Sequence, residues 1–172
     1  AMAKPRLTFQ DYLRNPAGKG SGMVGRRSSI LDDLRRRAAA LFRGRTPELV
    51  VHADGDSFVF LFGIPSEEFP TLQYDVVLRF DPPDAEAVSS GNISRYLMKY
   101  WSNAPAFMFT YAYTLNENGW LVDQLKDQLS DQSLKEKPKT RNPGLSWGYE
   151  KSCWFAALVM KEFRLLNKSK IR

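Results

Sequence analysis

Residues 49–63 of this chain read LVVHADGDSFVFLFG, and this stretch decides the fold. Two runs rich in β-branched and aromatic residues, 49–52 and 57–63, lie on either side of residues 53–56 (ADGD). An Asp-Gly pair between two such runs is typical of a β-hairpin, because both central residues of the tight turn can adopt positive φ. The stretch therefore predicts two strands joined by a short turn.

Two more strands are expected after this hairpin. Residues 72–80 alternate between apolar and mainly polar side chains, which gives one strongly apolar face and predicts a third strand that ends at 81–83 (DPP). Residues 84–91 are predicted to form a loop. Residues 93–101 mix β-branched and aromatic residues with Arg95 and Lys99, which favours a fourth strand, with a helix as the alternative.

Helices are expected on both sides of the strands. Ser29 and Asp32 have the spacing of a capping motif, and apolar residues then recur on one helical face, which predicts a helix over 29–43. Three helices are expected after the strands. They are predicted over 103–118, where a strand is the alternative, over 121–129, and over 149–163, where an apolar stripe is clearest.

These elements predict an α+β fold with an N-terminal basic arm and helix, a four-stranded, mainly antiparallel sheet and three C-terminal helices. The chain has 172 residues and is 43% hydrophobic, which suffices for one sizeable core. We expect a single domain over 29–166. Residues 1–28, which include the turn-rich stretch 15–22 (NPAGKGSG), are predicted to be a flexible basic arm, and 167–172 a fraying basic tail.

Charge is distributed in three blocks along the chain. Residues 1–50 carry eleven Lys and Arg against four Asp and Glu, residues 51–134 carry four against twelve, and residues 135–172 carry ten against three. The ends are therefore basic and the middle is acidic. A protein that docks head-to-tail on copies of itself gains from both signs, so this pattern favours self-assembly.

Several classes of function find little support in the sequence. Cys153 is the only cysteine and His52 the only histidine, which excludes an intrachain disulfide and a zinc site of the Cys/His type within one chain. A Cys153–His52 nucleophilic pair is the alternative to a packed structural cysteine, which we favour because Cys153 lies in an apolar helical pattern. No membrane span is expected, because no apolar run reaches about 20 residues.

Two motifs resemble ligand-binding sites, but loop and turn structure explains each of them better than a bound ligand does. Residues 18–21 (GKGS) resemble part of a phosphate-binding loop, but Leu13 stands where the first glycine of that loop is needed. His52, Asp54 and Asp56 could hold a hard cation, yet turn chemistry accounts for both aspartates. We predict no catalytic, cofactor-binding or metal-binding residues, no cofactor and no enzyme activity. An unrecognised site near His52 is the remaining enzymatic alternative.

Basic residues of the arm and first helix are the best candidate interaction surface, since several guanidinium groups could contact phosphates together. A solvated helix face is the alternative reading. The candidate residues are Lys19, Arg26, Arg27, Arg35, Arg36, Arg37, Arg43 and Arg45.

The region 96–120 is the richest in aromatic residues. We expect most of its rings in the core and a minority in an interface. The aromatic residues considered are Tyr96, Tyr100, Trp101, Phe107, Phe109, Tyr111, Tyr113 and Trp120.

Five short segments together resemble a group of small proteins of tailed bacteriophages that are regarded as virion structural components. They are 12–21 (YLRNPAGKGS), 64–67 (IPSE), 74–77 (YDVV), 101–107 (WSNAPAF) and 148–152 (GYEKS). The resemblance implies a protein of the capsid, neck or head–tail connector, located in the virion and, during assembly, in the host cytoplasm. It brings no catalytic residue.

The resemblance and the charge pattern lead to one functional expectation and one alternative. We expect a bacteriophage virion structural protein that self-assembles or docks on capsid, portal or neck components, with copies of itself or other virion proteins as partners. The alternative is a non-specific nucleic-acid-binding protein that contacts DNA through its basic arms and arginine cluster.

Overall fold

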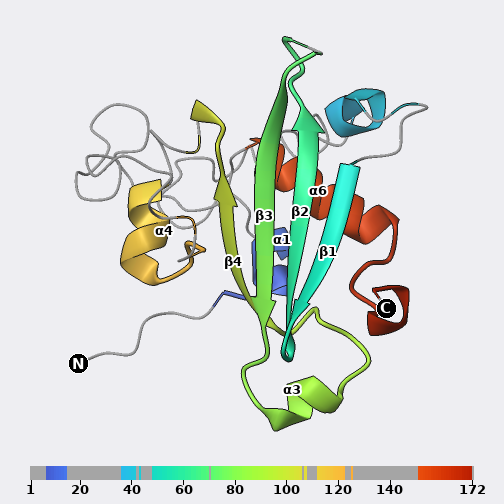
Figure 1. Cartoon of the computed structure of the whole chain (residues 1–172), viewed down its shortest axis with the longest axis vertical. Helices are drawn as coiled ribbons and strands as arrows, with labels where there is room; N and C mark the ends of the chain where they lie inside the picture. Colours follow the sequence, from blue (N-terminus) through green and yellow to red (C-terminus); the bar gives the residue numbers. More distant parts are fainter. Residues whose placement is uncertain are drawn as a thin grey trace.

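Four antiparallel strands form the centre of the computed structural model, which describes residues 7–14, 36–41, 43, 48–69, 71–105, 107, 112–122, 125 and 151–171. They are β1 (Glu48–Asp54), β2 (Ser57–Pro65), β3 (Gln73–Asp81) and β4 (Leu97–Ser102). Each strand pairs with the next one along the chain, so the order in the sheet is β1-β2-β3-β4 (Figure 1). The predicted α+β class and four-stranded antiparallel sheet are confirmed.

The turn between β1 and β2 lies one residue later than predicted. Asp54 pairs with Ser57, so Gly55 and Asp56 are the two central residues. Gly55 has a φ of 61°, whereas Asp56 keeps a negative φ. Glycine at the first central position is typical of a type II′ turn, and its lack of a Cβ removes the steric cost of positive φ.

The inner face of the sheet carries the core. Val51, Phe60, Leu78 and Tyr100 lie side by side across the four strands, and the last three are fully buried. Helices α1 (Phe9–Arg14) and α6 (Lys151–Glu162) lie behind this face in Figure 1. The described part of the chain therefore has a helical layer on one side of the sheet.

Helix α6 confirms the prediction of a C-terminal helix. Cys153, Ala156 and Met160 from the predicted stripe are fully buried, and the helix contacts β2, β3 and β4. Phe163, which was predicted to continue the stripe, is instead 53% exposed. The helix ends at Glu162, and Arg164 has a φ of 56°, which turns the chain away from the helical path.

The prediction of a flexible arm over 1–28 is wrong for residues 7–12. Leu7, Phe9 and Tyr12 are buried, and Tyr12 packs its ring 5.5 Å from Tyr100 and 5.7 Å from Trp154. A capping box begins α1, since the main-chain NH groups and side chains of Thr8 and Asp11 are hydrogen-bonded reciprocally.

The connection from β3 to β4 differs from the predicted loop over 84–91. A short helix, α3 (Ala85–Ser89), begins where the Asp84 carboxylate accepts a hydrogen bond from the Ala87 N–H at 2.8 Å. The predicted fourth strand begins at Leu97 rather than residue 93, because the chain turns between Ile93 and Tyr96.

The helices predicted over 103–118 and 121–129 are only partly within the described residues. Helix α4 (Ala112–Asn118) ends before Gly119, whose φ of 75° agrees with the predicted stop. The second helix does not begin at Leu121, because that residue forms a parallel bridge with Tyr100. Of the helix predicted over 29–43, residues 36–41 are helical, and most of the remainder lies outside the described residues.

The C-terminal tail was predicted to fray, but Lys168 is buried. Its ammonium donates to the carbonyl oxygens of Ala87 at 3.1 Å and Val88 at 2.7 Å, and lies 4.9 Å from the Tyr96 ring centroid. Residues Lys168–Lys170 form a short 3-10 helix. A cation near the carbonyl end of a helix is stabilising, so Lys168 fastens the tail to α3.

We predict that Lys168→Met lowers the free energy of unfolding by about 1–3 kcal/mol, because hydrogen bonds from a charged donor are lost. The exposed Lys170 provides the matched control, and Lys170→Met should change this free energy by less than about 0.5 kcal/mol. Urea unfolding measures both variants. Equal losses in the two would contradict the assigned role of Lys168.

Candidate functional site

The predicted basic surface is only partly within the described residues. Three of its members, Arg36, Arg37 and Arg43, are described. Ala38 is buried and Leu41 packs partly against the core, so this short helix docks on the domain by one face. The predicted residues outside the described ranges are Lys19, Arg26, Arg27, Arg35 and Arg45.

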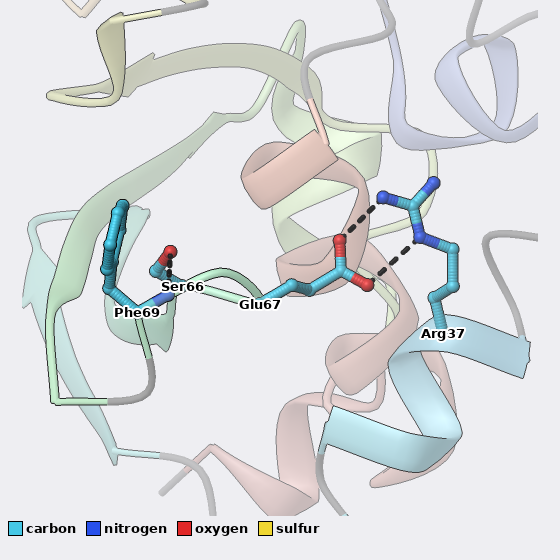
Figure 2. A network of polar contacts seen from close by, with 4 residues as sticks. All are labelled: Arg37, Ser66, Glu67 and Phe69. Carbon is cyan, nitrogen blue, oxygen red and sulfur yellow. Dashed lines mark hydrogen bonds and ion pairs between the residues drawn. The ribbon is translucent and has the colours of Figure 1, made fainter.

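Arg36 and Arg43 are exposed. Arg37 forms an ion pair with Glu67. The Arg37 Nε donates to Glu67 Oε2 at 2.9 Å and its Nη2 donates to Oε1 at 2.6 Å (Figure 2). This two-pronged contact links the helix at 36–41 to the connection between β2 and β3. Arg37, a candidate for phosphate contact with a solvated helix face as the alternative, therefore has a protein partner for its charge.

The same connection holds an exposed aromatic ring. The Ser66 hydroxyl accepts a hydrogen bond from the Phe69 N–H at 3.2 Å, and Phe69 is 56% exposed. In Figure 2 its ring points away from Arg37 and Glu67. The Leu72 N–H donates a hydrogen bond to the Phe69 carbonyl oxygen, which closes this turn. Leu72 is 46% exposed.

The aspartates of the first hairpin serve the turn and the sheet. Asp54 pairs with Arg79 at 2.9 Å, and Arg79 also contacts Asp81 at 3.0 Å. Burial disfavours the charged form of Arg79, but hydrogen bonds and charges from both aspartates outweigh it, so its pKa is raised. Ser57 Oγ donates to Asp81 at 2.6 Å, which completes the network.

His52 and Cys153 lie in different surroundings. His52 is exposed on β1, on the side of the sheet opposite to Val51, whereas Cys153 is fully buried in α6 behind the inner face. The structure does not bring them together as a nucleophilic pair. Within the described ranges no group of three or more His, Cys, Asp or Glu is placed to hold a metal ion.

The aromatic segment belongs largely to the core, as predicted. Five of its rings are buried, and Tyr113 is half-buried. Phe109 and Tyr111 lie outside the described residues. The buried rings are Tyr96, Tyr100, Trp101, Phe107 and Trp120.

An apolar row on the outer face of the sheet was not predicted. Val50, Leu61, Val77 and Trp101 are direct cross-strand neighbours from β1 to β4. Trp101 and Val77 are only 6% and 4% exposed, but Leu61 is 42% and Val50 61% exposed. The outer side of a one-layer antiparallel sheet is ordinarily polar, so exposed apolar residues here indicate a contact surface.

Charged and polar neighbours flank the exposed half of this row. On β1, Glu48 and His52 lie on either side of Val50 along the same face, and both are exposed. We call Glu48, Val50, His52 and Leu61 the outer patch. The sequence did not reveal it, because the predicted turn at Asp54-Gly55 pairs Val50 with Val59, whereas the observed register sets Val50 opposite Leu61.

Comparison with known proteins identifies no relative. No protein-family model matches the chain, and neither a curated protein nor a solved structure does. In the described part of the chain, no helix is long and apolar enough to cross a membrane.

We predict a coupling free energy of about 0.5–1 kcal/mol between Arg37 and Glu67, since the pair is two-pronged yet partly open to solvent. A double-mutant cycle with Arg37→Ala and Glu67→Ala, followed by urea unfolding, measures it. The same cycle on Lys170 and Glu67 is the control and should give a value near zero. A coupling of zero for Arg37 and Glu67 would show that the contact contributes nothing to folding.

Proposed function

We propose that this chain is a structural protein of a tailed-bacteriophage virion that acts by self-assembly or by docking on capsid, portal or neck components. The observation that carries the assembly part of the proposal is the outer patch, where apolar side chains face solvent on a strand pair. The virion setting rests on the resemblance of the five quoted segments. The role is that of a binding module without catalysis.

The charge pattern supports contacts between copies. The chain has basic ends and an acidic middle, so the basic end of one copy can approach the acidic middle of another. The outer patch adds a hydrophobic contribution to docking, because the exposed side chains of Val50 and Leu61 would be buried in the interface. Interfaces typically combine such an apolar centre with a polar rim, which Glu48 and His52 provide.

Non-specific binding of nucleic acid is the second candidate, and the exposed Arg36 and Arg43 favour it. The Arg37–Glu67 ion pair counts against it, because one guanidinium of the predicted cluster already has a carboxylate partner. Affinity that falls steeply as salt is raised would mark this activity.

We predict that Leu61→Lys reduces self-association, because it places a charge in the apolar centre of the outer patch. The matched control is Phe163→Lys, which changes another exposed apolar residue outside the sheet. Light scattering after size exclusion measures both variants and the parent chain, at low and high salt and with and without a short DNA duplex.

The proposal expects a defined oligomer without DNA, lost in Leu61→Lys and kept in Phe163→Lys. Equal oligomers in both variants would remove the outer patch from the account. A monomer that binds the duplex only at low salt would favour nucleic-acid binding over assembly.

A further inference from the structure

The two edges of the sheet differ in how their backbone groups are satisfied. On β4, the Met98 N–H donates to Leu7 O at 2.7 Å and the Tyr100 N–H donates to Trp120 O at 2.9 Å. Thr8 also bridges to Leu97, and Leu121 to Tyr100. Residues before and after the strand thus cover this edge.

The edge of β1 is open in the described structure. Asp54 and Ser57 are partners on either side of a two-residue turn, and in such hairpins the flanking pair is hydrogen-bonded. The alternation of an antiparallel ladder then points the backbone N–H and C=O groups of Leu49, Val51 and Ala53 away from β2. Outside the ladder with β2, no backbone hydrogen bond of β1 is found in the described part of the chain. β1 forms the right-hand edge in Figure 1.

Charged residues on β1 are confined to the two ends of the strand, Glu48 and Asp54. Natural edge strands are usually protected by Lys, Pro or a bulge, yet residues 49–53 read LVVHA and pair with β2 without interruption. The strand is seven residues long and carries the exposed Val50. A long, regular edge whose centre lacks Lys, Pro and a bulge is a template for a further strand.

We propose that β1 pairs antiparallel with β1 of a second copy, joining two four-stranded sheets into one sheet of eight strands. The two-fold axis passes between the two copies of Val50. This inference rests on the self-assembly branch of the proposed function and specifies its partner. An isologous pairing of this kind uses the same strand twice and closes as a dimer.

Side-chain faces and charge select the register. Both sheets keep their inner faces on one side only when outer-face residues oppose outer-face residues. Centring the pair on Val51 sets Glu48 opposite Asp54 twice, which places like charges together. Centring it on Val50 sets Glu48 opposite His52 twice, where a carboxylate can accept a hydrogen bond from an imidazole N–H.

The chosen register also matches the exposed residues. The two Val50 side chains meet at the axis in a non-hydrogen-bonded pair, in which side chains lie closest. Leu49 of each copy opposes Val51 of the other, so their outward N–H and C=O groups become bonded. The Glu48 carboxylate lies over Gly63 in the single chain, and pairing requires this exposed side chain to rotate toward the edge.

Disulfide trapping tests the register directly. In Val50→Cys the two thiols face each other across the axis, with Cα atoms about 4.5 Å apart, so mild oxidation should yield a covalent dimer. In His52→Cys the two cysteines are offset by four residues, about 13 Å along the strands, and should not link. The parent chain controls for Cys153, which is buried.

A covalent dimer in Val50→Cys alone supports the pairing. Its absence, or equal linking in His52→Cys, overturns the proposed register. If Val50→Cys fails to link while the parent still forms an oligomer that Leu61→Lys disrupts, the edge pairing is wrong and the proposed assembly function stands. A parent chain that is monomeric at every concentration overturns the edge pairing and the self-assembly branch of the proposed function, and leaves docking on other virion proteins.

Exchanging the charges at Glu48 and His52 distinguishes pairing between two copies from docking of a strand of another protein. Glu48→Lys and His52→Asp each remove the attraction at two symmetric places and should weaken the dimer about tenfold. Combining them restores opposite charges across the same pair and should recover most of the affinity. Concentration-dependent light scattering measures all three variants, and a double variant as weak as the singles would contradict the proposal.

Discussion

The strand β4 lies beside the aromatic core and needs hydrogen-bond partners on both sides, because unpaired backbone groups are costly in a buried setting. On one side β4 pairs with β3, and on its edge side it bonds to residues 7–8 and 120–122. Because residues 7–8 pair with β4, the N-terminal segment lies against the sheet, where the Tyr12 ring packs against the rings of Tyr100 and Trp154. The closed edge, and with it the position of residues 7–8 beside β4, thus follows from one backbone constraint.

Within the described residues the same constraint is left unmet on β1, and that asymmetry connects the fold to the proposed function. One edge is closed within the chain, while the other shows outward backbone groups at Leu49, Val51 and Ala53 together with the exposed Val50. In the outer row the exposed fraction of the apolar side chains increases toward this open edge, from Val77 through Leu61 to Val50. The open edge and the outer patch therefore form one continuous surface, which suits an assembly protein.

Sequence patterns predicted the parts of the fold that depend on neighbouring residues. The alternation over 72–80 and the stripe through Cys153, Ala156 and Met160 express strand and helix periods, and the structure has a strand over Gln73–Asp81 and a helix over Lys151–Glu162. Contacts between distant residues were missed, because no local period reports them. Lys168 bonds to carbonyls about eighty positions away, and Arg37, a candidate for phosphate contact, bonds to Glu67. The outer row became visible only once the strand register was known.

Amide hydrogen exchange as a function of protein concentration tests the asymmetry of the two edges most directly. In dilute solution the amides of Leu49, Val51 and Ala53 should exchange much faster than those of Met98 and Tyr100, whose partners lie within the chain. Raising the concentration should protect the first group and leave the second unchanged. Protection of the β1 edge amides equal to that of Met98 and Tyr100 at the lowest concentration would contradict the account.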